Sequence, residues 1–239
     1  MSVYAAQVCV AYNYIMNTQK NSTPYKTLAT IAAATALTAL ALRASRRSGV
    51  TDDDLAQSLP GDNIIPDAGY VADRATIINA TPEDIWPWLI QLGRDRAGWY
   101  APTWLERLLV WNKAKRGARH IVPAFQKLRV GDVVPDWGPG ELEVLAKHAP
   151  HVLIYGSVKP RDSEGYIPGD YLFSWVHTVE QISPTQSRVY TRLRMRTADS
   201  PVLNALAPVA GVFDYATMVT MYAGLKQNVE AATQRVHKD

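Results

Sequence analysis

The sequence contains a single cysteine, Cys9, in 239 residues. One thiol excludes an internal disulfide framework and any zinc site built from several thiolates. The net charge is only +3, from 25 Lys and Arg against 22 Asp and Glu. This small excess, without a concentrated basic face, excludes nucleic acid as the expected partner. Phenylalanine is also scarce, with 3 residues against 7 Trp and 12 Tyr. Aromatic side chains that carry a polar group suit wet pockets and membrane interfaces as well as cores.

Several common chemical motifs are missing. The sequence has no G-x-S-x-G elbow and no Walker pattern, and Gly138-Pro139-Gly140 lacks the third glycine of a phosphate-binding loop. His148 and His151 flank a turn without a nearby acidic or cysteine cluster, so no metal site is predicted. No cofactor is implied either.

The N-terminal region carries one long uncharged run. Residues Thr27–Leu42 contain no charged side chain, but a membrane span needs about 20 residues, so this Ala-rich segment is marginal. Three interpretations stay open: a single membrane anchor, a cleaved secretory signal, and a soluble Ala-rich helix. The anchor is favoured. Three arginines follow the run and two lysines precede it, which places the main domain on the cytoplasmic side, with a soluble cytoplasmic protein as the alternative.

The rest of the chain divides into a linker and one compact domain. Residues 1–47 form the extension, the turn-rich stretch 48–69 reads as a linker, and residues 70–239 form the domain. A strand is expected over Val71–Asn79, followed by helices that begin at Pro82 and Pro102. Further period-two patterns predict five strands, near 132–134, 141–148, 151–158, 170–182 and 187–196. A long helix over Asp214–Val236 follows, so the predicted class is α+β, with an antiparallel sheet covered by this helix.

The amino-acid sequences of three segments resemble those of a known superfamily. They read ATPEDIWPWLIQLGRDRAGWYAPTWLERLL, IVPAFQKLRVGDVVP and FSWVHTVEQISPTQSRVYTRLRMR, and the upstream LRASRRSGVTDDDLAQSLPGDNIIPD agrees with them. Together they resemble bacterial members of the START / polyketide-cyclase superfamily (SRPBCC, helix-grip fold) over about Leu42–Arg196. The resemblance implies a curved antiparallel sheet around the C-terminal helix, with a cavity for an apolar ligand. The superfamily contains lipid carriers, hormone and polyketide binders, and a few cyclases.

Alternation along the predicted strands selects the residues that face this cavity. On the strand from Asp170, four residues share the inward face, and four residues of the last helix oppose them. The loop Arg94–Tyr100 and the following Trp104 are candidates for the cavity mouth. The candidate ligand-contacting residues are Trp99, Tyr100, Trp104, Tyr155, Tyr171, Phe173, Trp175, His177, Met218, Met221, Tyr222 and Leu225. The competing interpretation is that these side chains fill a solid core.

Two further segments allow more than one interpretation. Arginines 188, 192, 194 and 196 alternate on one face of the last strand, which favours a solvated outer face over a lipid-headgroup contact. Tyr190 shares that face and is left out of the site. Residues Pro201–Phe213 are apolar except for Asn204, and Pro208 and Gly211 interrupt them. A buried connector into the last helix is favoured, with a lid over the cavity or a contact with the bilayer as alternatives.

Three functions follow from these patterns. The leading one is binding of an apolar or lipid-like small molecule, at a membrane surface if Thr27–Leu42 is an anchor. The second is a cyclase or dehydratase, for which His177 with Tyr155 or Tyr222 is the only acid–base pair that the sequence offers. The third is a membrane-tethered interaction protein with a filled core. No catalytic residue is assigned.

Overall fold

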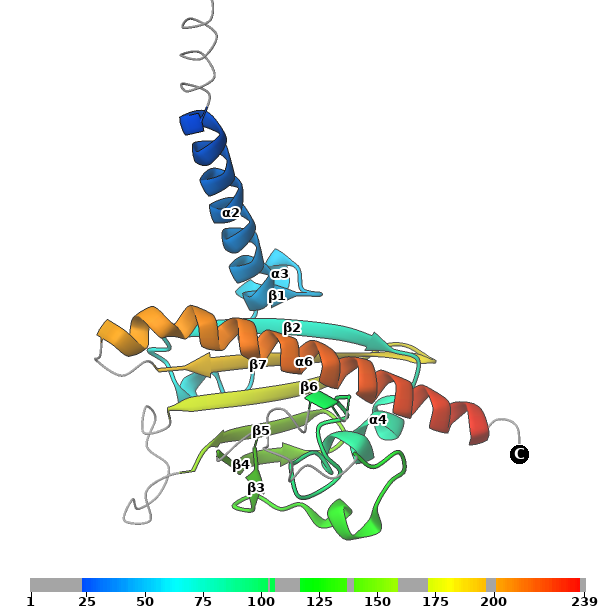
Figure 1. Cartoon of the computed structure of the whole chain (residues 1–239). Coiled ribbons are helices and arrows are strands. Elements are labelled where there is room, and N and C mark those ends of the chain that lie inside the picture. The colour runs from blue at the N-terminus through cyan, green and yellow to red at the C-terminus, as the bar shows by residue number, and fades with distance from the viewer. Residues whose placement is uncertain are drawn as a thin grey trace, which may run out of the picture. The chain divides into compact units, whose positions relative to one another are not determined.

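The computed structural model describes residues 23–102, 104–105, 117–136, 140–158, 172–196 and 201–236. The chain divides into two units, Met1–Arg43 and Ala44–Asp239. Helix α2 (Thr23–Arg46) makes up the described part of the first unit and contributes its last turn to the second. All strands and the remaining helices belong to the second unit (Figure 1).

A seven-stranded sheet with the order β1-β2-β7-β6-β5-β4-β3 forms the centre of the second unit. Its strands are β1 (Arg47–Ser48), β2 (Tyr70–Ile78), β3 (Val133–Pro135), β4 (Glu141–His148), β5 (Val152–Ser157), β6 (Phe173–Ser183) and β7 (Gln186–Met195). All neighbouring pairs are antiparallel except β1 and β2, which are parallel. The predicted antiparallel sheet is therefore confirmed, and the two-residue β1 is an addition too short for a sequence pattern to reveal.

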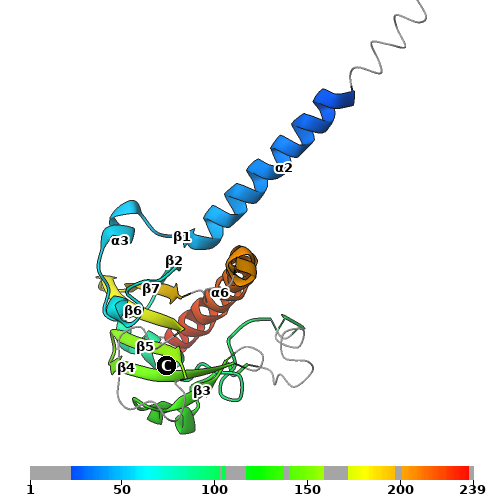
Figure 2. The ribbon, with the colours of Figure 1, turned by 90° about the vertical axis from the view of Figure 1, so that its left-hand side faces the viewer.

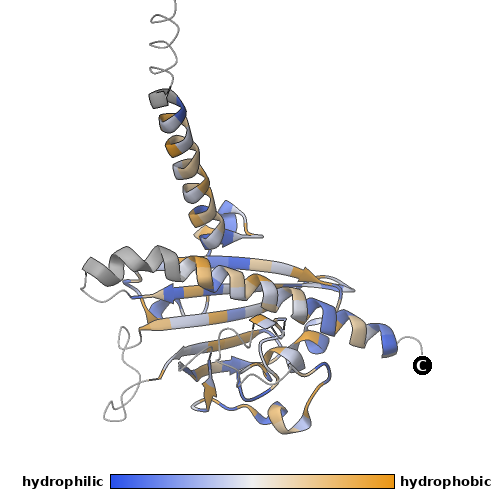
Figure 3. Ribbon diagram, viewed as in Figure 1, coloured by the Kyte–Doolittle hydropathy of each residue, from blue (hydrophilic) through white to orange (hydrophobic). Residues whose placement is uncertain are grey.

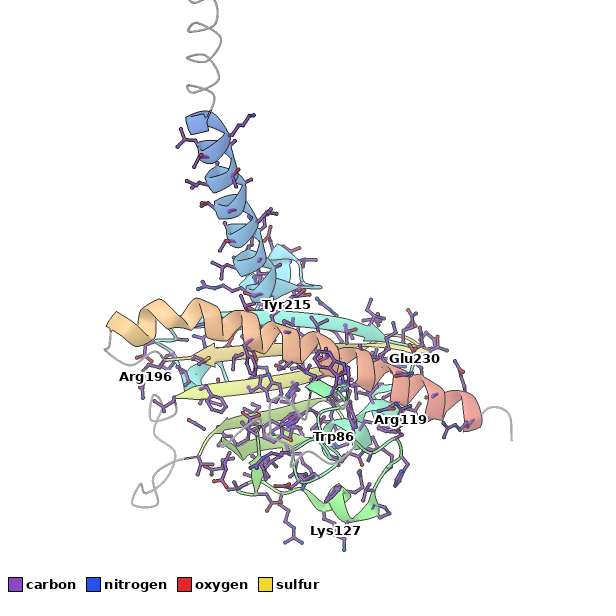
Figure 4. The ribbon with its side chains drawn as sticks, viewed as in Figure 1. Trp86, Arg119, Lys127, Arg196, Tyr215 and Glu230 are labelled. Carbon is purple, nitrogen blue, oxygen red and sulfur yellow. The ribbon has the colours of Figure 1, made fainter. Side chains whose placement is uncertain are left out.

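Helix α6 (Pro201–Val236) lies along the inner face of the sheet, which curves around it (Figure 2). This is the helix-grip arrangement that the sequence predicted. At the end of β2, Glu230 of α6 accepts hydrogen bonds from the backbone and side-chain amides of Asn79, at 2.9 and 2.6 Å (Figure 4). The exposed C-terminal turns of the helix are hydrophilic, whereas the turns over the sheet are more apolar (Figure 3).

The start of α6 corrects one expectation. The helix begins at Pro201 and not at Asp214, so the backbone of Pro201–Phe213 is a continuous part of α6 and not a separate segment before it. Pro208 and Gly211 were read as interruptions, but both lie inside the helix. At Gly211 a side chain would collide with the hydroxyl of Tyr70 on β2. The glycine is thus explained by close packing of helix on sheet, which a sequence pattern does not distinguish from a break.

Helix α4 (Pro82–Leu89) closes one end of the sheet and packs against α6 and β6. The Thr81 hydroxyl caps it by accepting the Asp84 backbone N–H at 3.3 Å, and Pro82 occupies its first turn, as predicted. The helix is shorter than expected, because it ends at Leu89 and not at Gly93. Of the second predicted helix, Pro102 is described and is not helical, residues 104–105 are helical, and the rest lies outside the described residues.

The outer face of the sheet is covered by the segment that the sequence analysis treated as a linker. This segment forms α3 (Asp52–Ala56) and the 3-10 turn η1 (Asp62–Ile64). Ile64 and Ile65 pack against Ile154 and Val176 in a second, smaller apolar cluster. A further 3-10 turn, η2 (Pro123–Lys127), precedes β3.

The arginines of β7 bind this segment, so the prediction that they form a solvated face is wrong. Arg188 donates to both carboxylate oxygens of Asp54 at 2.6 Å, and these hydrogen bonds hold the pKa of Asp54 well below its usual range. Arg192 is buried and pairs with Asp73 and Asp62, and Arg194 donates to the carbonyl oxygen of Ile65 at 3.0 Å. Three of the four predicted arginines, at positions 188, 192 and 194, are therefore held by protein groups, and the fourth, Arg196, follows the end of β7 and is half-buried.

Candidate ligand-binding site

Strand β6 presents the predicted residues to the inside of the domain. Phe173, Trp175 and His177 lie on the face toward α6, and Val176 points into the outer cluster, as alternation requires. Tyr155 on β5 pairs directly with Trp175 in the sheet register and is fully buried. Tyr171 lies outside the described residues.

A cavity of about 250 Å³ separates the sheet from α6 near the start of β6 and the end of β7. Trp175 of β6 and Met218 of α6 face each other across it, together with Leu193 of β7. The complete described lining is Asp136, Leu142, Phe173, Trp175, Leu193, Met195, Phe213, Asp214, Thr217 and Met218. The lining is mostly apolar, and it includes two carboxylate side chains, those of Asp136 and Asp214.

The other predicted helix residues lie further along α6. Met221, Tyr222 and Leu225 are buried in the main core cluster and do not line this cavity. The expected pairing of Trp175 with Met221 across the cavity is therefore wrong by one helical turn, because Met218 occupies that position. Helical spacing identifies the inward face of a helix but not which turn borders a space.

The predicted mouth residues have three different environments. Trp99 is buried, and its ring centroid lies 5.6 Å from that of Trp175. The Tyr100 hydroxyl donates to the carbonyl of Trp88 and accepts from the Gln91 amide, both at 2.8 Å, while its backbone has a φ of 57°. Trp104 is apart from this cluster, with 68% of its surface exposed.

A second cavity of about 300 Å³ lies beside Tyr100. Residues 100–102 and 117–119 form one wall, and the stretch 220–228 of α6 forms the other. Arg119, which also lines this cavity, lies beside α6 (Figure 4). At Gly224 of α6 a side chain would collide with the carbonyl oxygen of Tyr100, so loop and helix approach closely there. This cavity was not predicted, because its walls come from segments without a shared sequence pattern.

Hydrogen bonds link the buried side chains of His177, Thr191 and Tyr222 in the core of the domain. The Thr191 hydroxyl of β7 lies 2.9 Å from His177 Nδ1 and 2.6 Å from the Tyr222 hydroxyl, which also lies 3.2 Å from the carbonyl oxygen of Arg74. Burial lowers the pKa of His177 to about 3 and raises the pKa values of Tyr155 and Tyr222. All three side chains are therefore uncharged at neutral pH, and such a histidine is a weak general base.

Tyr155, Trp175 and His177 form an aromatic cluster. Their ring centroids lie 6.2 Å apart for Tyr155 and Trp175, 6.1 Å for Tyr155 and His177, and 4.4 Å for Trp175 and His177. Within the part of the chain that the structure describes, no hydrogen-bond partner meets Tyr155 Oη, Trp175 Nε1 or His177 Nε2. Buried polar atoms are nearly always paired in proteins, so three such atoms in one cluster are unusual.

One charged pair at the cavity edge was missed by sequence reasoning. Arg74 of β2 is buried, and it contacts the Asp214 carboxylate at 2.6 Å and the Ser45 carbonyl oxygen at 2.7 Å. Burial raises the pKa of Asp214, an effect that the neighbouring arginine opposes. The available signal was the alternation of β2, which places Arg74 on the same inward face as Tyr70 and Ala72.

Metal binding has no support in the described residues, which contain no group of three or more His, Cys, Asp or Glu side chains able to hold an ion. His151 Nδ1 instead lies 2.9 Å from the carbonyl oxygen of Val179.

Comparison with known proteins gives fold-level likeness only. No family model and no curated protein matches the sequence. Among solved structures, Ms6760 from Mycobacterium smegmatis is similar at 14% identity and a TM-score of 0.43, over 73% of this chain and 96% of that chain. Protein MLL2253 from Mesorhizobium loti shares 15% identity over 68% and 98% of the two chains, with a TM-score of 0.38. An HSP90 activator from Plasmodium falciparum shares 12% over 58% and 86%, with a TM-score of 0.33. The fold assignment here rests on the sheet order and on α6, and these distant likenesses assign no activity.

Proposed function

We propose that the domain binds a small apolar molecule in the cavity between the sheet and α6. The observation that carries this proposal is the lining itself, in which Phe173, Trp175, Leu193 and Met218 surround about 250 Å³ of space. Ligand pockets are typically lined by apolar and aromatic side chains with a few polar groups that orient the ligand. The helix-grip fold, with one helix held across a curved sheet, supports the same function.

The cavity size limits the ligand. Pockets for drug-sized molecules are typically about 300–1,000 Å³, so this cavity lies at the small end of that range. An apolar cavity of about 150 Å³ is enough to hold benzene. The ligand class that fits is therefore a single-ring aromatic molecule or a short acyl chain.

Two methionines of α6 provide a matched test. Met218 and Met221 are both buried, but only Met218 lines the cavity. We expect wild-type protein to bind toluene saturably in a calorimetric titration. Met218→Phe should abolish this binding with little loss of thermal stability, because the larger ring enters existing space. Met221→Phe should keep binding but lose about 1–3 kcal/mol of stability, because it overpacks a filled region.

Two results would contradict the proposal. One is the absence of toluene binding to the wild-type protein. The other is equal destabilisation by the two methionine variants, which would indicate a solid core and favour a protein-interaction role.

We further propose that α2 anchors the domain to a membrane, with the domain on the cytoplasmic side. The segment Lys26–Arg46 has 21 residues, a mean hydropathy of 1.5 over its most apolar window and no buried side chain in that window. Its large apolar residues, among them Leu28 and Leu37, are 65% and 67% exposed. Arginines 43, 46 and 47 follow it, which is consistent with a cytoplasmic C-terminal flank.

Vesicle flotation tests the anchor. The full chain should float with lipid vesicles, and a chain that starts at Ala44 should stay in the soluble fraction, because the second unit begins there. Leu37→Arg in the full chain should weaken flotation without altering the folded domain. Equal partitioning of the full and shortened chains would contradict the anchor.

A further inference from the structure

The cluster of Tyr155, Trp175 and His177 specifies the chemistry of the ligand beyond its apolar body. Each side chain buries a polar atom that meets no hydrogen-bond partner in the described part of the chain. Leaving such an atom unpaired costs free energy, whereas a ligand atom that pairs with it recovers that cost. Trp175 connects the cluster to the cavity, because it lines the cavity and its ring packs against Tyr155 and His177, which are outside the described lining.

The charges around the cluster determine which ligand group suits it. Burial keeps the histidine and the tyrosine neutral at pH 7. Of the carboxylates in the described lining, Asp214 is already paired with Arg74 at 2.6 Å. A charged ligand group would lose its hydration without gaining a free counter-charge there, which is strongly unfavourable.

Whether each of the three polar atoms donates or accepts a hydrogen bond narrows the choice of ligand group further. The indole N–H of Trp175 only donates, the Tyr155 hydroxyl donates and accepts, and His177 Nε2 does one or the other according to its tautomer. A hydroxyl both donates and accepts, so it suits this set whichever ring nitrogen of His177 carries the proton.

We propose that the ligand is an uncharged, hydroxyl-bearing small molecule whose oxygen hydrogen-bonds to the Tyr155–Trp175–His177 cluster while its apolar body fills the cavity. This inference rests on the proposed function, because it needs a ligand in that cavity. The Trp175 ring is the part of the cavity wall that stands against Tyr155 and His177. The proposal therefore requires that this ring moves on binding, so that the ligand oxygen reaches Tyr155 and His177.

The test uses three aromatic probes that share one ring and one methyl group. These are toluene, 4-methylphenol and 4-methylbenzoate, titrated calorimetrically into the full chain at pH 7.5. We expect 4-methylphenol to bind about 3- to 10-fold more tightly than toluene, the gain of about one hydrogen bond, and 4-methylbenzoate to bind more weakly than toluene.

Two buried tyrosines provide matched variants. In Tyr155→Phe, 4-methylphenol should lose its advantage and bind no more tightly than toluene. The same variant should raise the Tm of the free protein by about 2–4 °C, because it removes an unpaired buried hydroxyl. Tyr222→Phe should instead lower the Tm, because the Tyr222 hydroxyl bonds Thr191 at 2.6 Å.

The possible outcomes separate this inference from the proposed function. If toluene binds but 4-methylphenol has no advantage, or keeps its advantage in Tyr155→Phe, the hydroxyl inference is wrong and the apolar site remains. Tightest binding of 4-methylbenzoate also overturns it. A lowered Tm in Tyr155→Phe overturns it as well, because the hydroxyl then has a partner such as a buried water. If none of the probes binds, the proposed function itself fails.

Discussion

Replacement of Arg192 by methionine should be among the most destabilising changes on the outer face of the sheet. The Arg192 side chain is 4% exposed, and the carboxylate of Asp73 beside it is 6% exposed. Arg192 also donates to Asp62 at 2.8 Å and to the carbonyl oxygen of Gln57 at 2.9 Å. One guanidinium therefore joins β2, β7 and the segment around α3 and η1.

The expected loss follows from the carboxylate that the substitution leaves behind. Methionine matches much of the arginine volume but leaves Asp73 buried without its cation. Breaking a buried pair in this way costs about 3–5 kcal/mol, even where the intact pair adds little net stability. Arg188→Met is the matched control. Its pair with Asp54 is more exposed, at 21% and 13% for the two side chains, so we expect a loss nearer 1–2 kcal/mol.

Urea unfolding followed by tryptophan fluorescence measures both losses, and limited proteolysis reports whether residues 49–66 have come away from the sheet. A double variant that replaces Arg192 with Met and Asp73 with Leu should recover much of the loss, because no charge then remains unpaired. The reasoning is refuted if Arg192→Met costs less than about 1 kcal/mol, or no more than Arg188→Met.

Two further predictions concern the inner face. Burial depresses the pKa of His177 to about 3, below the unfolded value of about 6.5, so the unfolded chain binds more protons between these values and stability should fall as pH drops from 6.5 toward 3. Urea unfolding between pH 4.5 and 7.5 measures how the free energy of unfolding changes with pH, and we expect a slope of up to about 1.4 kcal/mol per pH unit. His177→Gln should remove this pH dependence. An unchanged slope in the variant would contradict this account. Gly224→Ala should lose about 1–3 kcal/mol by thermal unfolding, although this change normally stabilises a helix, because the new methyl group meets the Tyr100 carbonyl oxygen. A raised Tm would show that the loop moves away at little cost.

The strands and their inward faces were predictable because alternation is a local property. Each residue's neighbours two positions away share its face, so Phe173, Trp175 and His177 could be grouped from the sequence alone. The Thr81–Pro82 start of α4 was equally local, since a cap depends on a few adjacent residues. Features of this kind can be predicted without knowing which residues pack against them.

The misjudged features depend on partners distant in sequence. The arginines of β7 were expected to face solvent because their acidic partners, Asp54 and Asp62, lie more than a hundred residues earlier. The available clue was the acidic run 52–54 in a segment taken for a linker. Gly211 was likewise expected to interrupt the segment before the last helix, because the sequence does not show that Tyr70 occupies the space beside it.

The position of the cavity follows from unequal coverage of the inner face. Helix α4 packs against both α6 and β6 and contributes Ile85, Trp88 and Leu89 to the main core, whereas no residue of α4 is in the described lining of the cavity. Among the described residues, only the sheet, α6 and Asp136 line the space around Met218. A ligand in this space would supply packing contacts that its lining lacks, as the proposed function requires. Trp175 lines the space, and Tyr155 and His177 pack against Trp175, so the proposed hydroxyl-bearing ligand would satisfy the packing and the hydrogen bonding together.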